Sequence, residues 1–392
     1  MPDRGTWIWK FLPVTGYSWY KNKAMNGKFI LMAVAFAASI FVSAFLSYKI
    51  YNSDFPVYYF VASTILDPQA SPGDVYRYPE DTENRYSIPE RKDERDRFLY
   101  SLQAAYILAP LGWLPYYTAK TLMIFINIAA YLCAVVVILK LGNVSDRWVV
   151  RGAGISFLWL PFLSTLMGGQ INGIILLLVA VAVLAATRGR PYLCGALFAL
   201  AALFKLFPLA IALILGIRNR RILAGFAVFF GASFLLPGAA EWIPMIITFL
   251  KEDVKLPAYV VLETMHPLLV VIIPLLIGGM TALVTFLSKD TDYPMLASFA
   301  IPAAFLSMPR LGYYHLTVLV FSYCYLFSRK EFRTWPLAGF LIVSAIVIGF
   351  PRPGHLSPIF FDPVTVPMSI TLFAMWSVLG TKIAVQSFVP GD

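Results

Sequence analysis

Residues 117–139, YTAKTLMIFINIAAYLCAVVVIL, form a nearly unbroken apolar run that is long enough to cross the hydrocarbon layer of a membrane as one helix. Further apolar runs, many of roughly 15–20 residues, recur along the chain. Of the 392 residues, 59% are hydrophobic and only 13% are charged, whereas soluble domains carry about 25% charged residues. A soluble globule could not bury so much apolar surface. The sequence therefore predicts an all-α polytopic membrane protein.

The apolar runs predict a bundle of about 12 membrane helices. We expect them at residues 29–48, 117–139, 152–167, 172–187, 192–204, 206–217, 222–238, 267–287, 293–307, 312–327, 335–350 and 365–385. The runs 192–204 and 206–217 are too short to cross a bilayer fully, and each contains or borders Pro or Gly. Such segments are tolerated at membrane depth where they line a cavity. Some helices of the bundle are therefore expected to be short or broken.

The basic residues assign the two sides of the membrane. Five of them precede the first run, which places the N-terminus inside by the positive-inside rule. The other inside loops also carry basic residues, namely Lys140, Arg147, Arg151, Arg188, Arg190, Arg218, Arg220, Arg221, Lys289, Arg329, Lys330, Arg333 and Lys382. We expect both termini in the cytoplasm and the chain in the plasma membrane. The net charge of +10 is scattered between apolar runs and forms no stripe, which excludes nucleic-acid binding.

The chain is expected to consist of a short basic segment and one membrane domain. Residues 1–28 mix aromatic and lysine side chains, which is typical of a cytoplasmic segment lying in the membrane interface. Residues 29–392 are expected to form a single transmembrane domain, with an outer loop at 49–116 inserted after the first run. Within this loop, residues 54–66 are interpreted as an amphipathic helix and residues 98–115 as a helix at the outer surface. The three cysteines lie singly in apolar runs and indicate no disulfide framework.

Polar residues that could do chemistry gather on the outer side. Asp54 follows the first run, in the sequence NSDFPVYY at residues 52–59. A carboxylate among aromatic side chains can accept a proton from an attacking hydroxyl. Alternatively, Asp54 caps the helix that follows, with Pro56 in its first turn. One aspartate can fill both roles, and both hypotheses stay open.

Two further candidates lie where apolar runs end on the same side. The turn GGQING at residues 168–173 offers Gln170 and Asn172, beside glycines that let the backbone approach a ligand closely. It could equally be a tight turn whose amide side chains bond their own backbone. Lys205 separates two short runs, and an ammonium at such a place should reach an anion. The alternative is that Lys205 extends to the outer headgroups.

Arg310 and His315 lie in the sequence MPRLGYYH at residues 308–315, also on the outer side. Arginine presents a planar fork to phosphate oxygens, and histidine can donate to them or relay a proton. A solvated loop is the alternative interpretation. The sequence Asp-Thr-Asp at 290–292 matches the pattern with which cytosolic sugar-nucleotide transferases hold a metal. It falls in a short inside turn without a Rossmann-type domain, and we interpret it as a solvated loop.

Several of these stretches together resemble a known family. An aspartate at the outer end of the first run, followed by a large outer loop, is similar to membrane glycosyltransferases of the GT-C class. Within that class the sequence resembles glycosyltransferase family 87. The similar stretches are DFPVYY at 54–59, Pro-Leu at 110–111, Leu-Pro at 114–115, GQIN at 169–172, Gly195, KLFP at 205–208 and His315. The chain departs from the family at 262–265, where LETM stands in place of a frequent Asn-Gln-Ser.

The resemblance implies a GT-C-like bundle and transfer of a sugar, mannose or another monosaccharide, from a polyprenyl-phosphate donor. The acceptor would be a hydroxyl of a glycolipid or glycan on the outer face, and the reaction would invert the anomeric centre. The implied roles are Asp54 as general base; Lys205, Arg310 and His315 as ligands of the donor phosphate; and Gln170, Asn172 and Tyr58 as pocket residues. Fixed cations can manage a monophosphate leaving group, so neither a metal nor another cofactor is expected.

A transporter or flippase of a lipid-linked sugar is the alternative function. It explains the short runs and the outer cations, but it does not need a base beside the first run. Transporters also more often carry ionisable residues near the middle of their spans, whereas here the charges gather at the outer mouth. We therefore favour the enzyme.

Overall fold

The computed structural model describes residues 54–76, 88, 98–157, 159–245, 269–288, 292–307, 313–332, 334–349 and 365–388. The interfacial segment 1–28 and the first apolar run, 29–48, lie outside these residues. Throughout the described residues the regular structure is helical and contains no strand. The predicted all-α class is therefore confirmed for this part of the chain, while the count of membrane helices and the domain division stay predictions.

The helices begin and end as follows. They are α2 (Phe55–Leu66), η2 (Pro72–Tyr76), α4 (Leu102–Leu108), η3 (Ala109–Trp113), α5 (Tyr116–Leu141), α6 (Asp146–Ser156), α7 (Leu160–Met167), α8 (Asn172–Thr187), α9 (Pro191–Phe204), α10 (Phe207–Arg218), α11 (Arg220–Ser233), η4 (Ala239–Glu241), α14 (Leu269–Leu287), α15 (Tyr293–Leu306), η5 (Tyr313–Leu319), α16 (Val320–Ser328), η6 (Lys330–Phe332), α17 (Trp335–Gly349) and α18 (Thr365–Phe388).

Most of the predicted runs that fall on described residues coincide with single helices, but two do not. The run 152–167 is divided between α6 and α7, which meet at 57°. Pro161 lies in the first turn of α7 and has no N–H to bond back into α6, which favours a break at this place. The run 312–327 is likewise divided, into η5 and α16. By length and composition, α5 is the one described helix that could cross a membrane alone, or one of two if the bent pair counts as a span.

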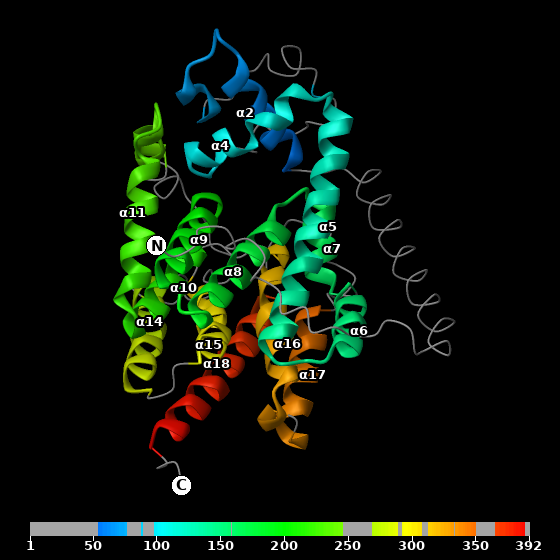
Figure 1. Cartoon of the computed structure of the whole chain (residues 1–392), viewed down its shortest axis with the longest axis vertical. Coiled ribbons are helices and arrows are strands. Elements are labelled where there is room, and N and C mark those ends of the chain that lie inside the picture. The colour runs from blue at the N-terminus through cyan, green and yellow to red at the C-terminus, as the bar shows by residue number, and fades with distance from the viewer. Residues whose placement is uncertain are drawn as a thin grey trace, which may run out of the picture. The chain divides into compact units, whose positions relative to one another are not determined.

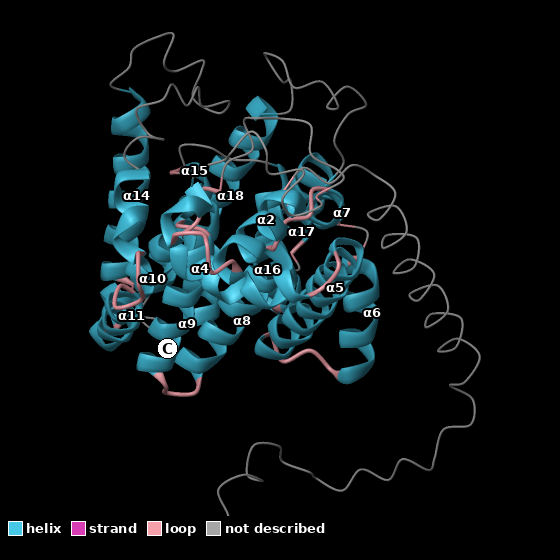
Figure 2. Cartoon of the chain, turned by 90° about the horizontal axis from the view of Figure 1, so that it is seen from above, coloured by secondary structure: helices cyan, strands magenta, loops and turns pink. Residues whose placement is uncertain are grey.

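The helices pack in two rows that contact each other. One row runs α11, α9, α8, α5 and α6, and each helix contacts the next (Figure 2). The other contains α14, α10, α15 and α16, with α17 and α18 against them, and α9, α8 and α5 contact this second row. Helices α2 and α4 lie at the end of the bundle where α5 begins (Figure 1). This end carries the candidate residues.

Helix α2 does not present the amphipathic face that the sequence predicts. Its residues from Phe55 to Ala62 are all buried, and Tyr58, Phe60 and Val61 are at most 1% exposed. The reason is that η2, η3, α4 and α5 surround it. A helix that is apolar all round belongs in a core. The amphipathic interpretation of 54–66 is therefore wrong.

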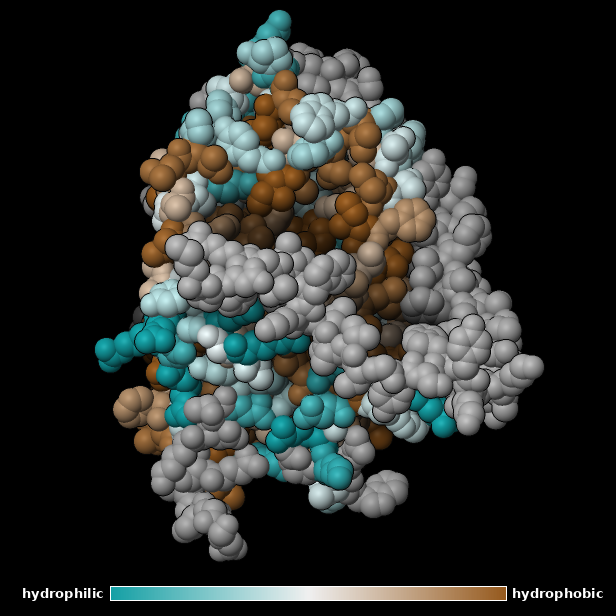
Figure 3. Space-filling model, viewed as in Figure 1, coloured by the Kyte–Doolittle hydropathy of each residue, from teal (hydrophilic) through white to brown (hydrophobic). Residues whose placement is uncertain are grey.

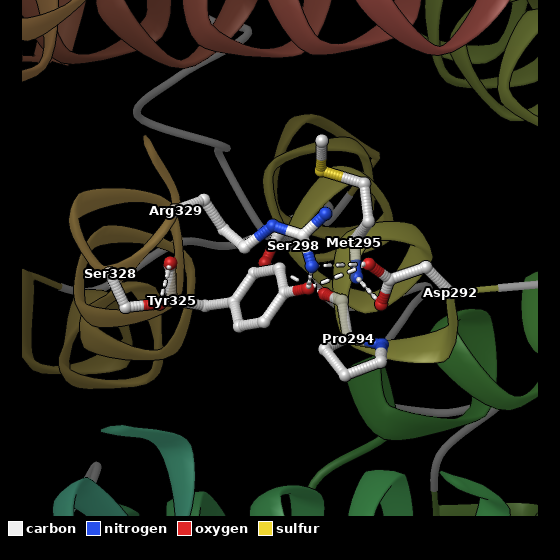
Figure 4. A network of polar contacts seen from close by, with 7 residues as sticks. All are labelled: Asp292, Pro294, Met295, Ser298, Tyr325, Ser328 and Arg329. Atoms are coloured by element: carbon white, nitrogen blue, oxygen red, sulfur yellow. Dashed lines mark hydrogen bonds and ion pairs between the residues drawn. The ribbon is translucent and has the colours of Figure 1, made fainter. Parts of the chain in front are cut away.

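At the opposite end of α5, a polar network joins α15 to α16 (Figure 4). Asp292 caps α15 by accepting from the Met295 amide at 3.3 Å, and its other oxygen accepts from the Tyr325 hydroxyl at 2.7 Å and from Arg329 at 3.1 Å. The Asp292 carboxylate is only 19% exposed. The solvated-loop interpretation is therefore wrong for Asp292, which is a structural anchor; residues 290 and 291 lie outside the described part.

Glycines set the closest helix crossing, between α9 and α11. A Cβ on Gly195 would lie 2.0 Å from the Ile222 carbonyl oxygen, and one on Gly225 would lie 2.3 Å from the Tyr192 carbonyl oxygen. Small residues at such crossings let two backbones touch. Position 195 thus has a packing reason to be glycine.

We expect Gly195→Ala to lower the free energy of unfolding by about 1–3 kcal/mol, because the added methyl group forces α9 and α11 apart. The measurement is the melting temperature in detergent. Gly231→Ala, on α11, is the matched control, since a Cβ there meets nothing within 4 Å. Equal melting temperatures for the two variants would show that the crossing tolerates the methyl group.

Candidate active site

The turn between α7 and α8 is built by two glycines. The Gly168 amide donates to the Ser164 carbonyl at 2.8 Å, which ends α7, and Gly169 adopts a φ of +65°, where residues with a Cβ are strained. The Gln170 amide then donates back to the Thr165 carbonyl at 2.9 Å. This reversal turns the Gln170 side chain into the protein, where it is 2% exposed.

The Gln170 side-chain oxygen is the centre of the site. It accepts a hydrogen bond from the Lys205 ammonium at 2.9 Å and lies 3.4 Å from the hydroxyl groups of Tyr58 and Tyr100. Tyr58 also donates to the Tyr100 hydroxyl at 2.9 Å. The Gln170 side-chain oxygen therefore bonds other segments, and the alternative in which it bonds its own backbone is wrong. The turn delivers an acceptor to groups from three other segments.

Lys205 lies at the break between α9 and α10, outside both helices, in extended backbone. Pro208, in the first turn of α10, cannot donate a backbone hydrogen bond to the preceding helix, so the chain breaks there. The Leu203 carbonyl freed by the break accepts from both the amide and the hydroxyl of Ser101, at 3.2 and 2.8 Å. Lys205 is 7% exposed. It points inward, so the alternative of extension to the headgroups is wrong for this structure.

Asp54 begins α2 beside the same turn. Its backbone amide donates to the Gly168 carbonyl at 3.2 Å, and its half-buried side chain makes no capping hydrogen bond to α2. The helix-cap hypothesis is therefore wrong as far as the side chain is concerned. Asp54 is close enough to act on Lys205: burial lowers the pKa of the Lys205 ammonium to about 7, and the negative charge of Asp54 opposes this by raising the pKa.

Asn172 is buried on the other side of the turn. Its side-chain nitrogen donates to the Thr165 hydroxyl at 3.1 Å, and Thr165 shares a 2.8 Å hydrogen bond with Thr317 of η5. Thr317 in turn donates to the Pro161 carbonyl at 2.9 Å. This network ties the start of α8 to η5, which contacts α7 and α8. Asn172 thus helps to fix the shape of the region through hydrogen bonds.

The remaining two predicted site residues come from the later part of the chain. His315 lies on η5, two residues before Thr317, and is 9% exposed. It is therefore buried in the element that closes against α7 and α8. Arg310 lies outside the described residues, and its role stays a prediction.

The structure adds two residues that the sequence reasoning missed. Tyr100 contacts Tyr58 with ring centroids 5.6 Å apart, besides the hydroxyl contacts already described. Lys120 lies near the start of α5 and is 0% exposed. The signal for Lys120 was present, since it is a lone lysine inside the longest apolar run. An ionisable residue in such a run is a functional hypothesis by default.

The assembled site brings an ammonium and two phenol hydroxyls to one amide, and it holds a carboxylate, that of Asp54, on a residue whose backbone bonds the same turn. Such a set can remove a proton from a hydroxyl and stabilise an anion nearby. In the described part of the chain, no group of three His, Cys, Asp or Glu side chains is arranged to hold a metal ion.

Two comparisons with known proteins agree with the family resemblance. The model of glycosyltransferase family 87 matches residues 98–255, a range that contains Tyr100, Lys120, Gln170 and Lys205 but not Asp54 or His315. An α-(1→3)-arabinofuranosyltransferase of Corynebacterium glutamicum is 26% identical, over 61% of this chain and 62% of its own length. The chain therefore spans less than two thirds of that relative. Together the matches support a GT-C-like glycosyltransferase of the family 87 type.

Proposed function

We propose that this protein transfers a monosaccharide from a polyprenyl-phosphate donor to a hydroxyl of a glycolipid or glycan, with inversion, on the outer face of the plasma membrane. The observation that supports the proposal is that Asp54 and Lys205 contact the same turn: the Asp54 amide bonds Gly168 and the Lys205 ammonium bonds Gln170. A reaction that takes a proton from a neutral hydroxyl and releases an anion needs one group of each kind.

The transfer is a single displacement. The acceptor oxygen forms a bond to the anomeric carbon of the sugar while the bond from that carbon to the phosphate oxygen breaks. Asp54 takes the hydroxyl proton, and the electron pair of the broken bond leaves with the polyprenyl phosphate. Attack from the side opposite the phosphate inverts the anomeric centre. Neither a redox partner nor a further co-reactant is required.

Lys205 holds the donor phosphate, because its ammonium is hydrogen-bonded to Gln170 at this site. Arg310 and His315 add to this phosphate site from the later part of the chain. Gln170 and Tyr58 form the pocket wall, and Asn172 keeps the turn in place through Thr165. Since these groups are fixed cations and hydrogen-bond donors, the proposal includes no metal and no other cofactor.

A lipid-linked donor suits the surface around this end of the molecule. Figure 3 shows a recess lined by apolar side chains beneath the layer of α2 and α4. On the elements at this end, Ile107 of α4 and Leu206 before α10 are each 47% exposed. Exposed apolar side chains are stable against lipid or a polyprenyl chain, and they cost free energy in water. Leu206 directly follows the proposed phosphate ligand Lys205.

The sugar has two candidate classes. The relative of C. glutamicum is named for arabinofuranose, a pentose, while the family resemblance also points to mannose, a hexose. The test uses purified protein in lipid with labelled polyprenyl-phosphate mannose, labelled polyprenyl-phosphate arabinofuranose and glycolipid acceptors. We expect labelled glycolipid from one donor, with the opposite anomeric configuration. Movement of the donor across the bilayer without a new glycosidic bond would reject transfer in favour of a transporter or flippase.

A further inference from the structure

Lys120 is a buried cation that the proposed mechanism does not yet use. It lies near the start of α5, at the end of the bundle where α2 packs, and none of its surface is exposed. A lysine near a helix end can usually extend along the helix to water. Burying an ammonium costs several kcal/mol unless surrounding groups compensate it. We therefore ask which groups on the buried side of α5 the Lys120 side chain serves.

The space beside Lys120 leads to the candidate site. Lys120 lines a small cavity of about 10 Å³ together with Asn127 of α5, Gly169 and Gln170 of the turn, and Phe55. A cavity of this size has room for about one water molecule. Phe55 directly follows Asp54, and Gln170 carries the oxygen that accepts from Lys205. Lys120 and Lys205 therefore lie beside the same turn: Lys120 shares a cavity with Gly169 and Gln170, and Lys205 bonds the Gln170 side chain.

Asn127, another polar residue of this cavity, already has hydrogen-bond partners within the structure. Asn127 accepts from the Gly173 amide at 3.2 Å and donates to the Met123 carbonyl at 3.1 Å. Position 173 must be small, because a Cβ there would lie 2.5 Å from the Asn127 carbonyl oxygen. Helix α5 therefore fixes the start of α8 through Asn127. Lys120 lies about two helical turns before Asn127 on α5, beside the Gly169–Gln170 turn.

We propose that Lys120 is a positioning residue of the transfer reaction: from this cavity it holds the Gly169–Gln170 turn in the orientation in which Gln170 receives Lys205 and the donor phosphate. The inference rests on the proposed function and names a residue through which α5 controls the donor subsite. Lys120 does not touch the reacting atoms. It acts through Gln170, and this distinguishes its effect from that of a second phosphate ligand.

The test is a double-mutant cycle with the full-length protein in lipid. The variants are Lys120→Met, Gln170→Leu and the two combined. Lys140→Met, at the other end of α5, makes the same substitution at an exposed residue that pairs with Asp146, and it serves as the matched control. The quantities measured are kcat and the KM values for donor and acceptor, with the melting temperature as the check on folding.

We expect Lys120→Met to lower kcat/KM for the donor about 10- to 100-fold, because a misplacement of about 1 Å at such a site can cost about 100-fold. The acceptor KM should stay within about twofold. Because Lys120 acts through Gln170, the double variant should be about as active as Gln170→Leu alone. Lys140→Met should match the wild type.

Two results would overturn the proposal while the wild type remains active. One is a donor kcat/KM for Lys120→Met that equals the wild-type value. The other is a double variant whose loss is the product of the two single losses, since this would make the residues independent. If Lys120→Met does not fold, Lys120→Gln replaces it; loss of folding there too would show that Lys120 serves stability only. A wild type without product rejects the proposed function instead.

Discussion

Asp54→Asn is expected to reduce the rate of sugar transfer about 100- to 10,000-fold, the usual contribution of a general base. The substitution keeps the shape of the side chain and removes its ability to take a proton. The fold should survive, because the Asp54 contacts that begin α2 are made by its backbone: its amide donates to Gly168 and its carbonyl accepts from Tyr58, each at 3.2 Å. The measurement is kcat with saturating donor and acceptor.

Asp74→Asn is the matched control for Asp54→Asn. Asp74 lies in η2, which contacts α2, and its carboxylate accepts from the Ser71 amide at 2.8 Å. This variant should keep nearly the full rate, because the Asp74 carboxylate bonds the Ser71 amide and the proposed mechanism gives Asp74 no role. An Asp54→Asn protein that melts normally and transfers sugar at the wild-type rate would remove Asp54 from the role of base.

Lys205→Met should lower kcat/KM for the donor by a factor of between about 30 and more than about 1,000. Removing one partner of a buried charged pair costs about 2–5 kcal/mol, and about 1.4 kcal/mol corresponds to a factor of ten. The loss should appear mainly in the donor, since the acceptor hydroxyl is handled by Asp54. The measurement is steady-state kinetics with each substrate varied in turn, and a loss confined to the acceptor KM would contradict the assignment.

The pH dependence gives Lys205 a second, independent test. Burial lowers the pKa of Lys205 to about 7, so its ammonium is charged below that pH and loses its proton as the pH rises through it. The donor phosphate binds the charged form, so wild-type kcat/KM for the donor should fall as the pH rises above about 7. Lys205→Arg keeps its charge throughout this range and should lack the decline. A decline that persists in Lys205→Arg would assign it to another group.

Local sequence patterns predicted much of the helical architecture. The runs 172–187, 192–204 and 206–217 match α8, α9 and α10 almost residue for residue. Continuous apolar stretches and Pro or Gly interruptions are local signals, because a proline cannot donate the backbone hydrogen bond that continues a helix. The signal favours a break without enforcing one, since α14 and α15 run through Pro274 and Pro302. The same logic explains the error at 152–167, where the apolar character continues through the break that Pro161 favours between α6 and α7.

The sequence predicted several residues of the candidate site but not the hydrogen bonds between them. Asp54, Gln170 and Lys205 were identified as polar residues on one side of the chain, and the structure brings them together at one turn. Tyr100 was missed because nothing in its local sequence separates it from the many other tyrosines of this chain. Lys120 was missed although it lies inside the apolar run 117–139, because the length of that run predicts a membrane helix and says nothing about which side chain of the helix is buried.

By itself the sequence determined that the chain is strongly apolar and helical in its described part, and it predicted that Asp54, Gln170 and Lys205 share one side. Tertiary structure alone decided which of them meet. The hydrogen bond from Lys205 to Gln170 joins residues 35 positions apart, and the contact from Tyr58 to Gln170 joins residues 112 positions apart. It also decided that α2 is buried on all sides and that Asp292 pairs with Arg329. Such pairings depend on how helices pack against one another, and helix periodicity fixes which residues share a face without fixing which helix that face will meet.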